Sequence, residues 1–488
     1  MRAPRSYSAK SRIGQHCQMS GRESPCRSQR GRREMRGAGL LLGLVLCATA
    51  YGATVSDADV ARAMATQPSS ASGFVERGNL LLAHRDYALA AADFSHALAL
   101  DPHSIAALAG RGIANARRGN SEAAHDDVTA ALAMDSSDLA ALRGRALVSA
   151  IDRNYAAAIA DWTVILQGHP DDLDALDGRS DAAFHADSYQ QAADDCAAYL
   201  KQRRDNWDIY LRQFTALLRN GNPEAARAVA ASVAGSDLEP ARQDGLALQM
   251  YRRLGDVEGM MRAADDLVRR DPGFWSYFSR AMAREASDTA GRAADIDEIE
   301  RLHGPAAMIV RLRAELLRDS GQYAAEIVAL DKYLDTATND KGEYLALRAA
   351  ANAALGNMPA ARSDQARAMQ GSKSAQDFNA VCWNLALSAR LLDGALKACD
   401  KSLQLAPNSA ATLDSRGLVL LRLGKYQDSI ASYDQSLQKQ PWEASSLYGR
   451  GLAELRSGNP AQGSADVAKA KVLEATVDAT FARYDLTP

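Results

Sequence analysis

A step of 34 residues recurs along most of this chain, and it constrains the fold more than any other feature. Residues 72–104 align with residues 106–138, and the blocks that follow keep the same register. About twelve units fit between residues 71 and 477. The clearest units begin at residues 71, 105, 139, 173, 207, 241, 376, 410 and 444. Because one short unit cannot bury its own apolar face, the repeat predicts a stacked array.

Each unit has the pattern of two helices joined by a turn. Apolar and small residues recur three and four residues apart, and pairs such as Gly-Asn and Asp-Pro mark the boundaries. Proline falls near the end of the second helix in five units, at Pro102, Pro170, Pro272, Pro407 and Pro441. No alternation typical of strands accompanies this pattern. The prediction is an all-α superhelical solenoid of about twelve helix-turn-helix units.

Small, aromatic and proline residues at fixed places in the unit add a second signal. The first unit has Gly78 at position 8, Ala90 at position 20 and Phe94 at position 24, and later units repeat parts of the pattern. The other matching residues are Ala97, Pro102, Gly417, Tyr433 and Pro441. This pattern resembles the tetratricopeptide repeat (TPR) family. The small residues let the two helices of a unit approach closely, so the physics agrees with the resemblance.

The repeat register predicts the order of segments along the chain. A basic leader and secretory signal at 1–50 and a linker at 51–70 precede the repeats. Regular units occupy 71–206 and 376–477, degenerate units occupy 207–375, and a C-terminal capping segment follows at 478–488.

The first 50 residues have the features of an export signal. Ten basic and two acidic residues lie in this segment, and an apolar run follows Met35. Ala48-Thr49-Ala50 has the small-x-small pattern of a cleavage site, so the mature chain is predicted to begin near Tyr51 in the periplasm or otherwise outside the cytoplasm. Either Met1 or Met35 is the true start. The apolar run is shorter than a membrane span, and no integral membrane domain is predicted.

Charge and motifs narrow the function. Without residues 1–50 the chain carries a net charge of about −11, which disfavours nucleic-acid binding because phosphates need basic surface. No phosphate-binding loop, zinc-protease motif, nucleophile elbow or C-x-x-C pair occurs. We therefore predict no catalytic residues, no cofactor and no metal site.

Arginine recurs at position 7 of the unit, and aspartate often follows sixteen residues later. This spacing predicts ion pairs that join the two helices of one unit and set their register. The predicted pairs are Arg77–Asp93, Arg111–Asp127, Arg145–Asp161, Arg179–Asp195, Arg348–Asp364 and Arg450–Asp466.

The resemblance to tetratricopeptide repeats implies a groove along the first helices that binds a protein or peptide. In the fourth unit the implied groove positions form an acidic strip, which Phe184 and Asp208 extend; its aspartates are Asp174, Asp177 and Asp181. The last two units contribute Asp414, Leu418, Leu421, Tyr448, Leu452 and Leu455. The alternative is that the acids are a solvated face and the leucines pack between helices.

Two late cysteines occupy the helix seam of one unit. Cys382 falls at position 7 and Cys399 at position 24 of the tenth unit, where the arginine–aspartate pair is lost. Two thiolates fill half of a tetrahedral metal shell, and redox motifs place their sulfurs closer in sequence. A disulfide and a pair of reduced core thiols remain as the two interpretations, and export favours the disulfide. Cys196 is expected to stay reduced.

These observations predict an exported, non-enzymatic scaffold that binds a protein or peptide in its groove. One alternative is an accessory subunit of a cell-envelope or polysaccharide assembly. Another is an enzyme with an unrecognised site in residues 207–375. The sequence indicates neither the partner nor the oligomeric state.

Overall fold

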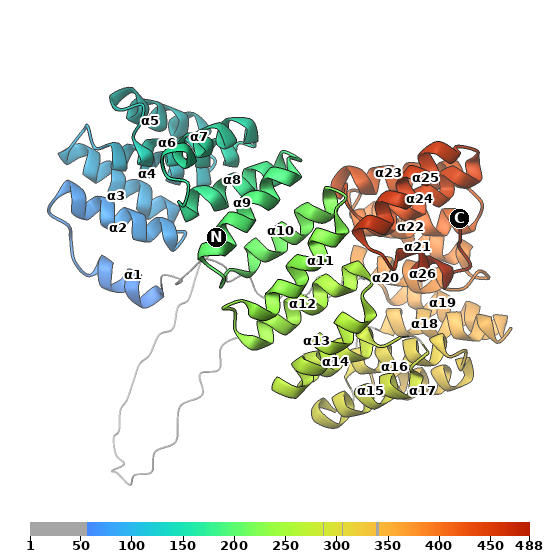
Figure 1. The fold of residues 1–488 in the computed structure, drawn as a ribbon. Coiled ribbons are helices and arrows are strands. Elements are labelled where there is room, and N and C mark those ends of the chain that lie inside the picture. The colour runs from blue at the N-terminus through green and yellow to red at the C-terminus, as the bar shows by residue number, and fades with distance from the viewer. Residues whose placement is uncertain (1–55, 286, 305, 338–340) are drawn as a thin grey trace, which may run out of the picture. The chain divides into compact units, whose positions relative to one another are not determined.

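The computed structural model describes residues 56–285, 287–304, 306–337 and 341–488. Over these ranges the chain forms twelve successive helix pairs, with one further helix before them and one after (Figure 1). The first helices of the pairs are α2 (Ala71–Ala83), α4 (Ile105–Arg117), α6 (Leu139–Ile151), α8 (Leu173–His185), α10 (Trp207–Arg219), α12 (Pro240–Leu254), α14 (Phe274–Ala283), α16 (Ala307–Asp319), α18 (Lys341–Ala354), α20 (Ala375–Ala386), α22 (Ala410–Arg422) and α24 (Ala444–Ser457). The second helices are α3 (Tyr87–Leu100), α5 (Ser121–Met134), α7 (Tyr155–Gly168), α9 (Tyr189–Gln202), α11 (Pro223–Ser232), α13 (Val257–Arg270), α15 (Thr289–His303), α17 (Tyr323–Thr336), α19 (Met358–Gly371), α21 (Leu392–Leu405), α23 (Tyr426–Lys439) and α25 (Pro460–Leu473).

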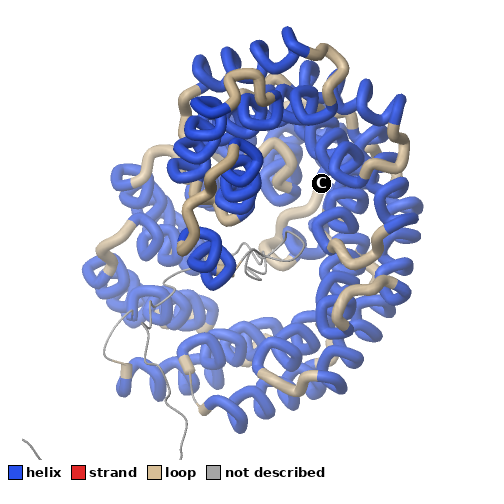
Figure 2. Tube along the Cα trace, turned by 90° about the vertical axis from the view of Figure 1, so that its left-hand side faces the viewer, coloured by secondary structure: helices blue, strands red, loops and turns tan. Residues whose placement is uncertain are grey.

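The predicted all-α solenoid of about twelve units is confirmed. Helices joined by short turns make up the array, and the described residues contain no strand (Figure 2). The helix pairs continue through 207–375, where the sequence signal is degenerate. The predicted linker at 51–70 contains a short helix, α1 (Asp57–Met64), and Ser56 forms a capping box at the start of that helix. The predicted export signal at 1–50 lies outside the described residues.

Many first helices begin where a short polar side chain precedes the unit. Ser70 accepts a hydrogen bond from the backbone N–H of Gly73, and Ser104 caps the next first helix in the same way. Asp138 and Asp172 repeat this cap for α6 and α8. Each cap satisfies an amide that the helix itself leaves without a partner, so it sets the helix start.

In ten units the turn between the two helices has a left-handed residue at position 15. Glycine takes this position in seven units, with φ between 64° and 95°. These glycines are Gly119, Gly221, Gly255, Gly321, Gly356, Gly424 and Gly458. Arg85, Arg153 and Asp187 take the same conformation in the other units where it is adopted, with φ from 58° to 71°. Glycine adopts this region without steric cost, which explains why it dominates.

The aromatic residue at position 24 packs into space that two glycines leave open. A Cβ atom on Gly78 would lie 2.8 Å from the Phe94 ring, and one on Gly110 of the next unit would lie 2.4 Å from it. Tyr433 is held in the same way between Gly417 and Gly449. The aromatic side chain therefore locks its own unit and the following unit together.

One degenerate unit redistributes the same volume. The unit that begins at residue 207 has Phe214 at position 8 and Ala230 at position 24, so the large and small residues have exchanged places. Both are buried in one core cluster. Packing depends on total volume more than on which position supplies it, and the helix pair survives the loss of the family pattern.

The structure contains all six of the arginine–aspartate pairs named from the sequence. Each guanidinium donates through Nε and Nη2 to the two oxygens of one carboxylate, as in Arg77 with Asp93 at 2.7 and 2.8 Å. The other five pairs have the same bidentate geometry. In Arg348 and Arg450 the remaining Nη1 also donates to an aspartate of the preceding unit, at 2.5 and 2.7 Å. These arginines therefore join three helices and two units.

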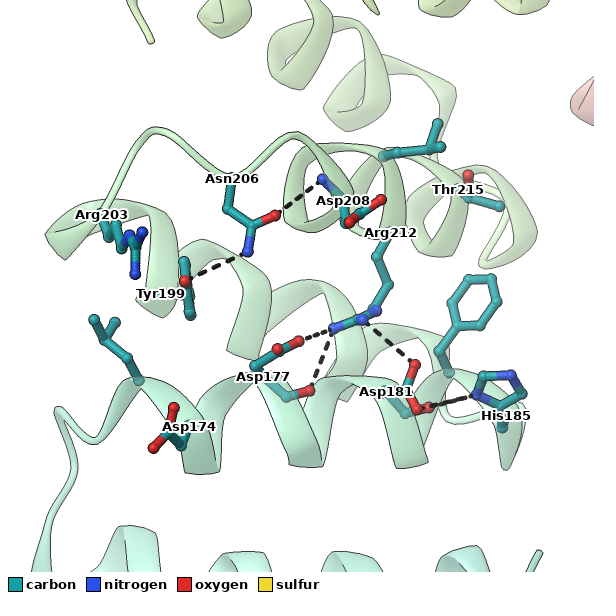
Figure 3. Close-up of a pocket in the computed structure, with 13 residues that line it drawn as sticks. Asp174, Asp177, Asp181, His185, Tyr199, Arg203, Asn206, Asp208, Arg212 and Thr215 are labelled. Carbon is teal, nitrogen blue, oxygen red and sulfur yellow. Dashed lines mark hydrogen bonds and ion pairs between the residues drawn. The ribbon is translucent and has the colours of Figure 1, made fainter. Parts of the chain in front are cut away.

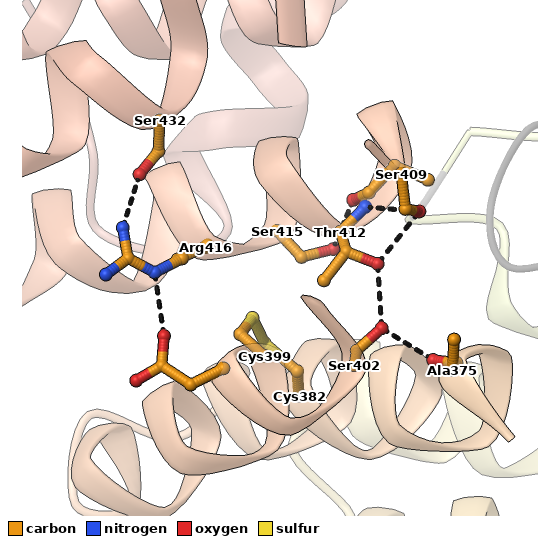
Figure 4. The surroundings of a disulfide bond; sticks show 11 residues. Ala375, Cys382, Cys399, Ser402, Ser409, Thr412, Ser415, Arg416 and Ser432 are labelled. Atoms are coloured by element: carbon orange, nitrogen blue, oxygen red, sulfur yellow. Dashed lines mark hydrogen bonds and ion pairs between the residues drawn. A yellow bond between two sulfur atoms is a disulfide. The ribbon is translucent and has the colours of Figure 1, made fainter. Parts of the chain in front are cut away.

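The structure joins Cys382 of α20 to Cys399 of α21 in a disulfide with the Cα atoms 5.2 Å apart (Figure 4). This separation lies within the range that a disulfide requires. Both cysteines are fully buried in a core cluster. Cys196 is a buried free cysteine, and burial raises the pKa of its thiol to about 12, so it stays an unreactive thiol. None of the described helices combines the length and apolar character needed to cross a membrane.

Candidate functional site

A pocket of about 760 Å³ lies between the first helices α8 and α10 (Figure 3). We call it the α8/α10 pocket. Its volume falls in the range of ligand-binding cavities in proteins. Four of the 13 lining residues are aspartates and two are arginines, and Leu173, Phe184 and Leu211 add apolar surface. The lining aspartates are Asp174, Asp177, Asp181 and Asp208.

Arg212 organises the acidic side of this pocket. It extends from α10 toward α8 and lies between Asp177 and Asp181 (Figure 3). Its Nη1 donates to Asp177 Oδ1 at 2.6 Å and to the hydroxyl of Ser180 at 2.7 Å, while Nη2 lies 3.4 Å from Asp181 Oδ1. This contact ties the first helices of two successive units together and neutralises part of the acidic surface.

The other aspartates are held more loosely. Asp174 is exposed, and Arg143 of the preceding unit donates to its Oδ2 at 3.1 Å. Asp208 is half-buried in the first turn of α10, where its backbone N–H donates to Asn206 Oδ1 at 3.1 Å. The pocket thus keeps carboxylate oxygens that Arg212 does not bind.

Burial and charge shift the pKa values of two pocket residues in the same direction. Burial raises the pKa of the Asp208 carboxyl; the positive charge of Arg212 opposes this shift and the negative charge of Asp177 adds to it. Burial by itself would lower the pKa of Arg212, but the charges of Asp177 and Asp181 outweigh it and hold the pKa above its ordinary value. Arg212 is therefore a permanent cation, while Asp208 gains a proton at a higher pH than an ordinary aspartate.

The structure brings the predicted acidic strip together. Asp174, Asp177, Asp181, Phe184 and Asp208 all line the α8/α10 pocket. The sequence reasoning missed Arg212, which stands at position 6 of its unit. In other units that position holds glycine, as in Gly110, Gly178 and Gly449, so the departure from the repeat was the signal that could have found it.

The predicted apolar groove in the last two units needs a correction. Leu418, Leu421, Tyr448 and Leu452 are at most 3% exposed and belong to one core cluster. Leu455 is half-buried against the same cluster, and Asp414 accepts hydrogen bonds from Ser445 and Ser446. These leucines and Tyr448 are therefore not open to a partner, because neighbouring helices and the chain's own C-terminal residues cover them.

Over the part of the chain that the structure describes, no group of three or more His, Cys, Asp or Glu side chains could hold a metal ion. In the α8/α10 pocket the Nδ1 of His185 is hydrogen-bonded to the carbonyl of Asp181 at 2.9 Å. The pocket offers carboxylates, one fixed arginine and apolar side chains, a combination suited to holding a cationic group beside an apolar one.

The family comparison agrees with the repeat register and the helix pairs. A family model described as tetratricopeptide repeat matches residues 75–138 and 415–470. The chain folds as a solenoid of helix pairs, and these two segments of it carry tetratricopeptide repeats. The matched segments contain the first regular units and the last ones, and helix pairs continue between them through the degenerate units.

Solved structures with similar folds come from several organisms. The crystal structure of the yeast protein Tom70 matches this chain with 14% sequence identity and a TM-score of 0.38. The match covers 85% of this chain and 94% of the Tom70 chain. Pseudomonas aeruginosa pilF is 18% identical over 44% of this chain and 97% of its own, with a TM-score of 0.34. The Naa15/Naa10 complex bound to HypK-THB is 16% identical over 84% of this chain and 65% of the matched chain, with a TM-score of 0.37. No curated protein matches this sequence.

Proposed function

We propose that this chain is an exported, non-catalytic scaffold that binds a protein partner through a cationic segment in the α8/α10 pocket. The observation that carries the proposal is the pocket itself, which places four aspartates and three apolar side chains on first helices of successive units. Stacked repeats create extended concave surfaces that bind other molecules, which supports a protein partner rather than a small substrate.

The charges of the pocket support a lysine- or arginine-bearing ligand. Arg212 forms a close ion pair with Asp177 and a longer one with Asp181. Asp174 and Asp208 also line the pocket, outside these two ion pairs. A lysine or arginine side chain can bond to the carboxylate oxygens that Arg212 does not bind, while its neighbours contact Phe184 and Leu211. An acidic peptide would meet repulsion at the same surface.

Binding of short labelled peptides, measured by fluorescence anisotropy, tests the ligand class. We expect a peptide with alternating lysine and leucine to bind, and a glutamate–leucine peptide of the same length not to bind. The double variant Asp181→Asn, Asp208→Asn should bind the lysine peptide with about 10-fold lower affinity, equivalent to about 1.4 kcal/mol of binding free energy. Asp194→Asn is the matched control, because Asp194 is exposed on the second helix α9 and outside the pocket lining.

Two outcomes would contradict this assignment. Equal binding of the lysine and glutamate peptides would show that charge does not select the ligand. A loss of affinity in Asp194→Asn as large as that in the pocket variant would show that the peptide binds outside the α8/α10 pocket. Acidification gives an independent check. Because the raised pKa of Asp208 makes it protonate at a higher pH than an ordinary aspartate, lysine-peptide affinity should begin to fall at a pH above the ordinary aspartate range. Asp208→Asn should reduce that dependence.

Export is the part of the proposal that rests on the sequence alone. Its support is the apolar run after Met35 and the Ala48-Thr49-Ala50 pattern. N-terminal sequencing of the protein from its native cell should find a start near Tyr51. An intact N-terminus in the cytosolic fraction would end this part of the proposal. Affinity capture from an envelope extract, compared with the same capture by the pocket variant, would then distinguish a general scaffold from an accessory subunit of an envelope assembly.

A further inference from the structure

The C-terminal residues of the chain lie across first helices of several units. We call residues 477–488 the C-terminal segment; it begins with α26 (Val477–Ala482) and ends in a short irregular stretch. The Phe481 ring contacts the Tyr448 ring of α24, with centroids 4.8 Å apart. The Tyr484 ring meets the Trp383 ring of α20 edge to face at 6.0 Å. The segment therefore reaches from the last unit back to the tenth.

Val477 at the start of the segment is buried in the last core cluster, and three further side chains anchor the rest of the segment. Phe481 and Leu486 are buried in the core cluster that contains Leu418, Leu421 and Tyr448, and Tyr484 packs against the same cluster. The backbone N–H groups of Tyr484 and Leu486 both donate to the carbonyl of Phe481, at 2.9 and 3.2 Å, so a tight turn holds the three residues close together. Burial raises the pKa of Tyr484 to about 12, consistent with its enclosed ring.

The polar contacts around these anchors lie at the surface. Arg483 lies 3.8 Å from Asp319 of α16 with 57% of its side chain exposed, and Lys471 pairs with Asp478 at 2.7 Å with both side chains more than 40% exposed. Arg456 donates to the backbone carbonyl of Thr487 at 3.2 Å. Exposed pairs of this kind contribute little, so the three apolar anchors supply most of the attachment.

We propose that the C-terminal segment is an exchangeable, intramolecular ligand. Its site is the surface of α20, α22 and α24 beneath it, which we call the C-terminal groove. The kind of partner that fits this groove is a peptide with the same spacing: two aromatic residues three apart and a leucine two residues further on. The segment gives a template for this ligand, because Phe481, Tyr484 and Leu486 already fill the groove in this order. This site is separate from the α8/α10 pocket and does not depend on it.

An attached ligand lowers the affinity of the groove for a free one. A short intramolecular connection gives an effective concentration on the order of millimolar, and a free peptide must compete against it. The apparent dissociation constant rises by the inverse of the fraction of chains whose groove is open. A variant that keeps the groove but weakens the anchors should therefore bind the free peptide more tightly than the wild type.

The test uses a fluorescent peptide with the sequence of residues 477–488 and the full-length chain. We expect it to bind the double variant Phe481→Ser, Leu486→Ser at least 10-fold more tightly than the wild type. A peptide with serine at its three anchor positions should bind neither chain. The matched control is Ala482→Ser, Thr487→Ser, which changes two exposed residues of the segment and should behave as the wild type. Adding Trp383→Ala to the Phe481→Ser, Leu486→Ser variant should lower its affinity for the peptide again, because Trp383 belongs to the groove.

A second measurement on the wild-type chain keeps the proposal testable if the anchor variant does not fold. Excess unlabelled peptide should increase deuterium uptake in the chain's own residues 477–488, whereas the serine peptide should not. Equal peptide binding by the wild type and a folded anchor variant would overturn the proposal, as would unchanged uptake at saturating peptide. A wild-type dimer that the anchor variant fails to form would also overturn it, in favour of exchange between two copies.

Discussion

Position 15 has a left-handed backbone in ten units, and Arg85, Arg153 and Asp187 adopt it without being glycine. The left-handed region costs a side-chain-bearing residue about 1–2 kcal/mol, because its Cβ atom crowds the following carbonyl. The seven glycines at this position avoid that cost. These three units therefore carry local strain that the rest of the array tolerates.

Arg153→Gly should stabilise the chain. Arg153 is exposed at φ 62°, so the substitution relieves the backbone without removing a buried contact. We expect a gain of about 1 kcal/mol, reduced in part by the greater freedom of glycine in the unfolded chain. Thermal unfolding followed by circular dichroism measures it. Arg153→Ala is the control, because alanine keeps the Cβ atom and should give no such gain.

Glu326 predicts a pH dependence of stability. Its side chain is fully buried on α17, Arg318 pairs with one oxygen, and the other oxygen has no hydrogen-bond partner. Burial raises the pKa of its carboxyl, and the charge of Arg318 only partly opposes this. The folded chain therefore holds the proton more tightly than the unfolded chain, and stability falls as pH rises from the ordinary glutamate range through the raised pKa.

Glu326→Gln should remove this part of the pH dependence. Relative to the wild type, the variant should gain stability as pH rises over that window, because glutamine has no proton to lose. Urea unfolding at a series of pH values measures the difference. Glu224→Gln on the exposed surface of α11 is the control and should run parallel to the wild type. Parallel curves for Glu326→Gln would mean that Glu326 titrates like an ordinary glutamate.

The two helices of a unit are joined by different links in different units. In six units a bidentate arginine–aspartate pair connects the two helices, and in the tenth unit a disulfide takes the same seam. Around it, Ser402 of α21 donates to the carbonyl of Ala375 at 2.6 Å and contacts the Thr412 hydroxyl of α22 at 2.9 Å (Figure 4). Covalent and polar links thus replace the lost ion pair at this unit.

Loss of the disulfide should destabilise the chain by roughly 3 kcal/mol, as expected for a loop of 17 residues. Urea unfolding with and without reductant measures this cost, and the double variant Cys382→Ala, Cys399→Ala should not respond to the reductant. Cys196→Ala should respond as the wild type does. Peptide mapping of the unreduced protein checks the bond directly. Recovery of Cys382 and Cys399 both alkylated would show that they are ordinary core thiols.

On the scale of the whole chain, stability is expected to vary along the array. Each unit contacts mainly its neighbours, so local contacts decide how easily a segment opens. Large apolar side chains are exposed in the seventh and eighth units, with Trp275 at 57% and Val328 at 68%. From α22 through α25 no large hydrophobic residue is exposed to that degree. The seventh and eighth units are therefore expected to be less consolidated than the last two.

Hydrogen exchange should reveal this difference. We expect the backbone amides of α14–α17 to exchange at least 10-fold faster than those of α22–α25, equivalent to about 1.4 kcal/mol in the free energy of opening. Exchange measured by mass spectrometry on the full-length chain gives the comparison. Uniform protection over both regions would show that the array opens only as one cooperative unit.

The sequence by itself determined the helix pairs, their number and the links within each pair. These features depend on residues close together in the chain: Phe94 lies 16 residues from Gly78 and 16 from Gly110, and Arg77 lies 16 residues from Asp93. A 34-residue period therefore contains the contacts themselves, and the repeated pattern makes them visible without an alignment. The same reasoning placed Asp177 and Asp181 on one helix face.

Only the tertiary structure decided which of these faces stays open. Arg212 contacts residues of the preceding unit, 35 positions away in the case of Asp177, and neutralises part of the strip. Tyr448 and Leu418 have the pattern of groove residues, yet Phe481 and Leu486 of the C-terminal segment lie in one cluster with them. The sequence period indicates on which face of its helix a side chain lies. Whether another part of the chain covers that side chain depends on distant, non-repeating contacts that a repeat pattern does not contain.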